Sequence, residues 1–210
     1  LTSGPYFPAF GDNAAGASST LWTNFGQRPF AYTAPSGYKA LCTQNLPTPT
    51  IGATSTTLAG KYFNPVTYTG DSAFSRSITG VGFQPDFTWI KSRTGGTYYH
   101  ILTDAVRGVN SQLFSNDTLA QESRTDRLTA FNSDGFSIGS YPDVNLSTGT
   151  YVAWNWKANG SGSTNTSGTI TSTVSANTTS GFSVVTYTGT GTTGTIGHGL
   201  GVAPSMIIVK

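Results

Sequence analysis

Six acidic residues in the central part of the chain are the first candidates for catalysis. They are Asp86, Asp104, Glu122, Asp126, Asp134 and Asp143. A hydrolase needs paired carboxylates in one cleft, a metal cluster, or a nucleophile beside an oriented base. The surroundings of these acids favour structural roles instead, and we predict a chain that is not an enzyme and that carries no cofactor.

The immediate neighbours of these acids indicate what they do. Asp104 and Arg107 are three positions apart, which favours an ion pair or a turn bond. Asp134 stands in the sequence Asn-Ser-Asp-Gly, which is typical of a turn. Asp143 and the nearby Asn145 could offer oxygen ligands to calcium, but one carboxylate and one amide are too few for a site. We therefore predict no metal site.

The two histidines and one glycine-rich stretch add no catalytic pattern. His100 lies in an aromatic, strand-like run, where packing accounts for it. His198 occupies a position that holds a threonine in the other copy of an internal repeat, so the repeated fold does not need an imidazole there. Residues 194–201 are rich in glycine, but they lack the Lys-Ser/Thr ending and the strand–helix context of a phosphate-binding loop.

Aromatic residues are the stronger signal, because sugars present apolar C–H faces that stack on aromatic rings. The candidates are Trp22, Trp89, Tyr98, Tyr99, Tyr141, Trp154 and Trp156. Asparagine and aspartate supply the hydrogen bonds that such a site also needs. We predict carbohydrate binding by Tyr98, Tyr141 and Asn145, with packing in the fold as the alternative for the tyrosines.

Short β-rich runs separated by turn signals must position these side chains. The runs are Asn64–Thr69, Asp86–Ser92, Thr97–Leu102, Ala130–Asn132, Gly135–Ile138 and Thr150–Lys157. The last run alternates cleanly, and we expect the face of Val152, Trp154 and Trp156 to belong to the core. Only Thr118–Leu128 could form a short helix, with a polar loop as the alternative.

Composition supports an all-β fold and excludes several classes of function. Charged residues make up 10% of the 210 residues and 26 are glycine, which suits strands joined by tight turns. A net charge of +2 without a Lys/Arg cluster gives no case for nucleic acid. The single Cys42 excludes an internal disulfide and a cysteine-based zinc site. No apolar run reaches membrane-spanning length, so we expect no membrane insertion.

Self-similarity is the clearest feature of the chain as a whole. Residues 63–91 align with residues 182–210 without a gap, and aromatic, glycine, proline and lysine residues match in register. The identical positions in the first segment are Phe63, Val66, Thr67, Tyr68, Thr69, Gly70, Gly80, Gly82, Pro85 and Lys91. A second copy of the same module therefore starts near residue 181, and we expect Lys210 to be a cut within it.

The repeat and the uncharged Thr/Ser-rich stretches predict how the chain is divided. Residues 1–46 form a first piece with strand-like runs, and residues 47–60 a linker. Residues 61–159 form a complete module, residues 160–180 a Thr/Ser/Gly-rich linker, and residues 181–210 the start of the second copy. The predicted fold is all-β, with antiparallel β-sandwich or jelly-roll modules in tandem, partial at both ends.

Two stretches resemble known families. Residues 5–46 are similar to the C-terminal end of a SPRY-type β-sandwich, through Asn24-Phe25-Gly26, Pro29-Phe30, Tyr32 and Pro35-Ser36-Gly37. The following region resembles a module of phage virion and tail proteins. Its motifs are Tyr68-Thr-Gly, Gly82-Phe-Gln-Pro-Asp86, Trp89-Ile-Lys91, Asp104-x-x-Arg-Gly108, Asn132-Ser-Asp-Gly-Phe136 and Tyr151-Val-Ala-Trp-Asn-Trp-Lys157. The resemblance implies concanavalin-like sandwiches in tandem behind a SPRY-like segment.

The resemblance also implies a structural or adhesive role on the surface of a bacteriophage particle, as a tail fibre, a spike or a capsid-decorating protein. The expected partners are other copies of the protein and other virion proteins, with cell-surface glycans of the host as candidate ligands. One alternative is a cellular adhesin or extracellular filament protein built from sandwich repeats. A polysaccharide depolymerase ranks last.

Overall fold

The computed structural model describes residues 36–37 and 58–210, and the structural statements below concern these residues. Residues 58–210 belong to one compact unit, which begins at Thr48. The predicted SPRY-like segment, apart from residues 36–37, and most of the linker predicted after it lie outside the described residues, as do Trp22 and Cys42.

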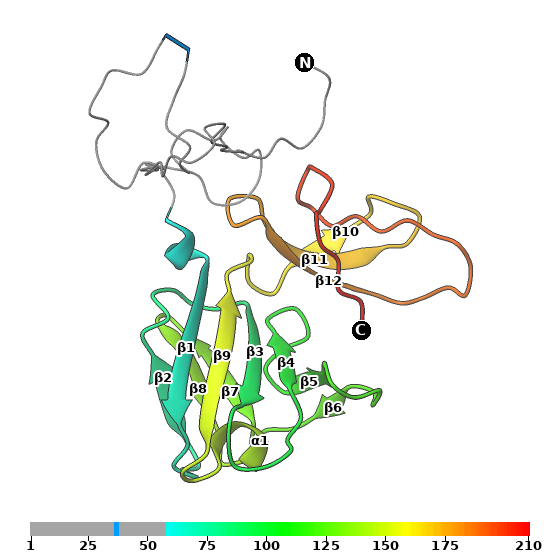
Figure 1. The fold of residues 1–210 in the computed structure, drawn as a ribbon. Coiled ribbons are helices and arrows are strands. Elements are labelled where there is room, and N and C mark those ends of the chain that lie inside the picture. Colours follow the sequence, from blue (N-terminus) through cyan, green and yellow to red (C-terminus); the bar gives the residue numbers. More distant parts are fainter. Residues whose placement is uncertain (1–35, 38–57) are drawn as a thin grey trace, which may run out of the picture. The chain divides into compact units, whose positions relative to one another are not determined.

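Short antiparallel strands build the described part, so the predicted all-β, antiparallel sandwich fold is confirmed. The larger sheet has six strands in the order β1-β9-β3-β4-β5-β6 (Figure 1). They are β1 (Phe63–Thr69), β3 (Phe87–Ser92), β4 (Ile101–Asp104), β5 (Ser111–Phe114), β6 (Glu122–Ser123) and β9 (Thr150–Trp156). The smaller sheet, ordered β2-β8-β7, contains β2 (Arg76–Thr79), β7 (Leu128–Asn132) and β8 (Gly135–Ile138).

These two sheets enclose one apolar core. The larger sheet contributes Ile90, Tyr151 and Ala153, and the smaller sheet contributes Leu128 and Phe136, all of them fully buried. Side chains of a strand that covers a core on one face alternate between inside and outside. β3 follows this rule, with a buried residue at every second position.

Strand β9 lies between β1 and β3 and turns a different face inward than the sequence predicts. Tyr151, Ala153 and Asn155 are buried, whereas Trp154 and Trp156 are only partly buried. The predicted alternation is present, but the expectation that the tryptophans belong to the core is wrong. Trp154 and Trp156 pack instead against aromatic neighbours on the outward face of the sheet.

The buried amide of Asn155 explains how a polar residue can occupy an inward position. Its Oδ1 accepts a hydrogen bond from the Thr88 hydroxyl at 3.1 Å, and its Nδ2 donates to the Asn64 carbonyl at 3.0 Å. Burying a polar group is costly unless it is hydrogen-bonded. Asn155 therefore ties together β1, β9 and β3 from within the core.

One end of the sandwich is closed by a short helix, α1 (Pro142–Asn145) (Figure 1). The rings of Tyr68 and Tyr151 stack beneath it with their centroids 5.1 Å apart. Tyr68 donates its hydroxyl hydrogen to the Val144 carbonyl at 2.9 Å, and Tyr151 donates to the Pro142 carbonyl at 2.6 Å. Two tyrosines from the larger sheet thus hold α1 in place. At the start of the sandwich, a 3-10 turn, η2 (Ala59–Lys61), precedes β1.

An aspartate and two glycines link the turn between β7 and β8 to the loop after β2. Gly80 and Gly82 have φ angles of +86° and +84°, a conformation that glycine adopts without strain. Their N–H groups donate to the two carboxylate oxygens of Asp134, at 3.1 Å and 2.6 Å. Neighbouring N–H groups that converge in this way form an anion-binding nest. The predicted turn residue Asp134 therefore also joins segments that are distant in the sequence.

A third sheet follows the sandwich and contains β10 (Ser163–Asn165), β11 (Ser172–Asn177) and β12 (Phe182–Tyr187). The sequence predicts a linker over residues 160–180, and the structure corrects this, because β10 and β11 lie there. β11 pairs along its whole length with the apolar β12, and its Val174 and Ser175 are buried. Pairing with β12 thus gives order to a segment whose composition alone favours a linker.

Residues Thr118–Leu128 form a loop, the short strand β6 and the first residue of β7. The helix alternative for this stretch is therefore wrong, and the polar-loop alternative is closer. Strands β2 and β5 have no counterpart among the predicted runs, because their polar sequences, such as Arg-Ser-Ile-Thr, carry little β signal.

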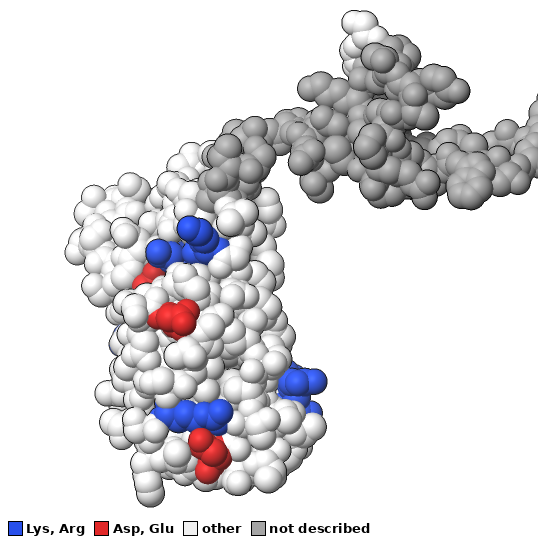
Figure 2. All heavy atoms as spheres, turned by 90° about the vertical axis from the view of Figure 1, so that its left-hand side faces the viewer, with Lys and Arg blue, Asp and Glu red and all other residues white. Residues whose placement is uncertain are grey.

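The surface of the described part carries few charges. Figure 2 shows the side of the sandwich on which β2 lies, where a few charged side chains, some of opposite sign next to each other, lie within a broad uncharged surface. Several charges are removed from solvent in ion pairs, for example Arg107 with Asp104 at 2.6 Å. The uncharged surface leaves packing and stacking as the main means of contact.

Candidate functional site: the aromatic face of the larger sheet

The outward face of the larger sheet carries a block of aromatic side chains where β1, β9 and β3 run side by side. Antiparallel pairing places Trp156 between Phe63 and Phe87, and Trp154 next to Trp89. Ring centroids lie 4.8 Å apart for Phe63 and Trp156, and 5.4 Å apart for Phe87 and Trp156. Those of Trp89 and Trp154 are 5.8 Å apart. We call these five residues the aromatic face.

Alternation along three adjacent strands explains why the aromatic face forms. Each of its members is an outward residue of a strand whose inward residues belong to the core. Cross-strand aromatic pairs of this kind stabilise a sheet beyond the area that they bury. Because the rings are only partly covered, and Phe63 is 38% exposed, the face can still stack on a flat apolar surface. The C–H face of a sugar or another aromatic ring offers such a surface.

Phe182, the first residue of β12, already stacks on one end of the aromatic face. Its ring lies 5.8 Å from that of Trp156, with an interplanar angle of 21°, and 5.8 Å from that of Phe87. Phe182 is the counterpart of Phe63 in the internal repeat. The first strand of the repeated segment 182–210 therefore packs on the aromatic face.

Hydrogen bonds reinforce this junction between the sandwich and the segment that follows it. The buried carboxylate of Asp86 accepts from the Ala158 N–H at 2.8 Å, and the Ser180 hydroxyl donates to the Lys157 carbonyl at 2.9 Å. Burial raises the pKa of Asp86, against the opposing effects of the Gly160 and Ala158 N–H groups and the charge of Lys157. Asp86, one of the acids considered for catalysis, thus fixes the chain where it leaves β9.

Of the three residues predicted to bind carbohydrate, Tyr98 and Tyr141 lie in loops and Asn145 is the last residue of α1, and their surroundings differ. Asn145 is fully buried; its Oδ1 accepts from the Asp71 N–H at 3.0 Å and its Nδ2 donates to the Ala73 carbonyl at 3.1 Å. Its amide therefore serves the fold, because it is neither accessible nor free. Tyr98 and Tyr141 are partly buried, and carbohydrate binding by these tyrosines stays a prediction.

Tyr141 belongs to a cluster around a buried arginine. The guanidinium groups of Arg124 and Arg127 lie 4.0 Å and 4.7 Å from the centre of its ring. Arg127 is 1% exposed and pairs with Asp143 at 2.7 Å and with Glu122 at 2.8 Å. Burial raises the pKa of Asp143, although the positive charge of Arg127 opposes the rise. A buried arginine needs such partners, so the cluster accounts for both acids.

Asp104 also has a structural role. It is 2% exposed, and its Oδ1 accepts from the N–H groups of Val106 and Arg107 at 3.0 Å and 2.8 Å. Its Oδ2 accepts from the Arg107 Nε at 2.6 Å. The predicted ion pair and the predicted turn bond are thus both present. Within the described ranges, no group of three or more His, Cys, Asp or Glu side chains is arranged to hold a metal ion.

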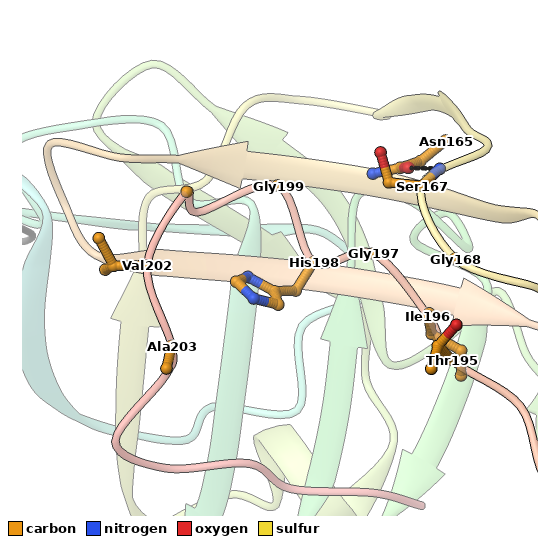
Figure 3. A pocket seen from close by; sticks show the side chains of 11 residues that line it. Asn165, Ser167, Gly168, Thr195, Ile196, Gly197, His198, Gly199, Val202 and Ala203 are labelled. Atoms are coloured by element: carbon orange, nitrogen blue, oxygen red, sulfur yellow. Dashed lines mark hydrogen bonds between the residues drawn. The ribbon is translucent and has the colours of Figure 1, made fainter.

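A shallow hollow of about 660 Å³ lies in the C-terminal part, between the loop after β10 and the chain from Thr195 to Ala203 (Figure 3). Its walls combine glycine backbone, polar groups such as that of Asn165, the ring of His198, and the apolar side chains of Ile196, Val202 and Ala203. The Nδ1 of His198 accepts from the Leu200 N–H at 3.2 Å, so its ring is held by the backbone. No acidic side chain lines the hollow.

Sequence reasoning found the tryptophans of the aromatic face but not Phe63, Phe87 or Phe182 as their partners. The signal was present, because each phenylalanine starts a strand-like run with outward residues at every second position. The antiparallel register brings Phe63 and Phe87 to the two sides of Trp156, and this register cannot be read from the sequence.

The fold and this site define a class of protein: an antiparallel β-sandwich with an aromatic face on which the strand β12 packs. Comparison with known families assigns the chain more closely. Residues 58–210 match the model of the domain of unknown function DUF7483, and the chain belongs to this family. No curated protein sequence and no solved structure matches it. Among the described residues, no helix is long and apolar enough to cross a membrane.

Proposed function

We propose that the chain is a structural segment of a bacteriophage virion surface protein, a tail fibre, a spike or a capsid-decorating protein built from tandem sandwich modules. The observation that carries this proposal is the stacking of Phe182 on Trp156 and Phe87. A protein whose modules pack end on end through built junctions suits an elongated or multicopy assembly. Its partners are other copies of itself and other virion proteins.

The roles of the acidic residues support a structural rather than a catalytic function. Asp86 binds the chain at the junction, Asp104 binds Arg107, and Asp143 binds Arg127. Asp134 binds two backbone N–H groups. Carboxylates used in this way are not free to act as a general acid or base, which is why a depolymerase is the weakest of the alternatives.

Particles purified from the source provide the test. We expect antibodies against residues 58–210 to label the outer surface of the particles in electron micrographs, and quantitative mass spectrometry to find several copies per particle. Finding the protein only as a secreted monomer that cleaves a polysaccharide would refute the proposal. Finding it in filaments on cells that carry no virion genes beside its gene would favour the adhesin alternative.

Glycan contact is a second candidate function, and the exposed part of the aromatic face favours it. Phe182 covers the end at Trp156, whereas the pair of Trp89 and Trp154 has no stacking partner from β12. We expect saturation-transfer NMR to detect binding of host surface glycans, and Trp154→Ala to abolish the signal. Phe74→Ala, at a site that is 90% exposed in the loop between β1 and β2, is the matched control. Equal signals from both variants would argue against this function.

A further inference from the structure

The second copy contains the counterparts of three strands of the sandwich, but these segments pair with different neighbours. By the repeat, β12 corresponds to β1, residues 195–198 to β2, and residues 206–210 to residues 87–91 of β3. In the first copy, β1 and β3 both pair with β9, which lies between them. In the second copy, β12 pairs with β11, and residues 206–210 belong to no strand.

Residues 206–209 expose an unbroken apolar run, Met-Ile-Ile-Val. Met206 is 75% exposed, Ile207 73%, Ile208 65% and Val209 72%. The counterpart of Val209 in the first copy is Ile90, which is 0% exposed and pairs with Ala153 of β9. Contiguous exposed apolar side chains of this kind mark a surface that a partner covers. In the first copy, Ile90 has β9 beside it in the same sheet and packs in one core with side chains of the smaller sheet, such as Phe136 of β8.

The glycine pair of the second copy is an independent sign of the same partner. Gly199 and Gly201 have φ angles of +74° and +79°, close to those of their counterparts Gly80 and Gly82. In the first copy this backbone binds the carboxylate of Asp134. The second pair lies in the hollow of Figure 3, which no acidic side chain lines. The backbone geometry for a carboxylate is therefore present without the carboxylate.

From these observations we infer that residues 182–210 are a docking site for a polypeptide segment with the chemistry of residues 132–156. Its aspartate binds the Gly199–Gly201 backbone, and its strand, patterned like β9, inserts antiparallel between β12 and residues 206–210. A tyrosine, an alanine and an asparagine at alternate positions of that strand face inward, as Tyr151, Ala153 and Asn155 do in the first copy. The partner is thus a segment of the same module type, whatever the location of the protein.

A synthetic peptide of residues 130–158, added to the whole chain, tests the inference. We expect hydrogen–deuterium exchange to slow at residues 182–187 and 206–210, and fluorescence anisotropy of the labelled peptide to report saturable binding. Exchange that slows at β1 and β3 instead would mean invasion of the first copy and would overturn the inference. So would protection of residues 206–210 by self-association that an excess of the peptide does not displace.

Substitutions in the chain and in the peptide make the test specific. Val209→Asp should weaken binding at least about tenfold, because docking would bury the new carboxylate at the position that corresponds to Ile90 in the first copy. Phe74→Asp, at a residue that is 90% exposed, is the matched control and should leave binding unchanged. Both sites are exposed in the free chain, so circular dichroism should show two folded variants. Equal effects of the two substitutions would contradict the inference.

In the peptide, Asp134→Asn should weaken binding by roughly tenfold, because charge-assisted hydrogen bonds to the Gly199–Gly201 backbone are lost. Asp143→Asn in the same peptide should have no effect, since the partner of Asp143 in the first copy is Arg127, which the peptide lacks. A peptide that binds equally well without the Asp134 carboxylate would show that the glycine pair takes no part in docking.

Discussion

At the scale of single residues, carboxylates in this protein serve as connectors. Asp134 joins the β7–β8 turn to Gly80 and Gly82, which are 54 and 52 positions away in the sequence. The sequence predicts its turn, because Asp before Gly is typical there. The sequence could not predict the partners of Asp134, because almost every residue has a backbone N–H group and no motif marks the two that bind. Asp104 was more predictable, since its partner Arg107 lies within the same turn.

Asp134→Asn should change how stability depends on pH. The N–H groups of Gly82 and Gly80 hold the pKa of Asp134 below its ordinary value of 3.8. A lowered folded-state pKa contributes stability above that ordinary value, and the contribution is lost as the pH falls through the folded-state pKa. We therefore expect the difference in unfolding free energy between wild type and variant to be full at neutral pH and to shrink in acid. Urea titrations at a series of pH values measure it, and a constant difference would contradict this account.

Asp104→Ala should destabilise the sandwich by about 3 kcal/mol, because it leaves the partly buried Arg107 and two turn N–H groups without their acceptor. Chemical denaturation measures the loss, and folding yield should fall with it. Asp117→Ala removes only a local loop bond to Leu119 and should cost less than about 1 kcal/mol. A well-folded Asp104 variant that lost a sugar-cleaving activity would instead make Asp104 catalytic.

At the scale of elements, strand existence is easier to predict than strand orientation. The alternation of residues 150–157 predicts β9 almost to the residue, but it leaves open which face is inside. Hydrophobicity alone predicts that the face with the two tryptophans is the buried one. The protein instead buries Ala153 and Asn155, because the opposite sheet fills the core and Asn155 finds partners on both neighbouring strands. Such partners appear only once the strands are paired.

The tyrosines that hold α1 should make the protein sensitive to alkali. Burial, together with the nearby Tyr151, raises the pKa of Tyr68 well above its ordinary value of 10.0, against the opposing charge of Arg76. Burial also raises the pKa of Tyr151. A raised folded-state pKa contributes stability below the ordinary value, and this is lost as the pH rises through the folded-state pKa.

We therefore expect cooperative unfolding above pH 10.0 that coincides with tyrosine ionisation at 295 nm. Tyr68→Phe should be less stable at neutral pH, because the bond to the Val144 carbonyl is lost, yet its stability should decline less steeply in alkali. Tyr187→Phe, at an exposed tyrosine of β12, serves as the control. Parallel alkaline curves for wild type and Tyr68→Phe would show that Tyr68 does not set this limit.

At the scale of the whole described region, the repeat predicts that two copies exist but not how they meet. The structure adds that residues 163–177, which read as part of a linker, form strands that pair with the second copy. Their order comes from contacts with β12, and such long-range pairing leaves little trace in a Thr- and Ser-rich composition. The aromatic junction at Phe182 was equally hidden, because stacking depends on the register of three separate strands.

Phe182→Ala should loosen this junction without unfolding the sandwich. Removing a ring stacked on Trp156 and Phe87 should cost roughly 1–2 kcal/mol of junction stability. We expect red-shifted tryptophan emission and faster proteolysis between β9 and β12, with the melting temperature of the sandwich nearly unchanged. Tyr187→Ala, at the far and 45% exposed end of the same strand, should change neither signal. Loss of the sandwich itself in Phe182→Ala would show that the two parts fold as one.

The pairing of β1 with β9 has a mechanical consequence. These first and last strands of the sandwich are antiparallel, from Phe63 opposite Trp156 to Thr69 opposite Thr150, and the chain enters and leaves at the same end. Tension on the flanking segments would first load the junction at Asp86 and Phe182, which lies outside the β1–β9 pair. It would then reach the Lys157–Tyr62 backbone bond and break the following bonds one at a time. Strands pulled in this direction yield at low force. A row of such modules would lengthen step by step under load and absorb a pull before any covalent link is strained.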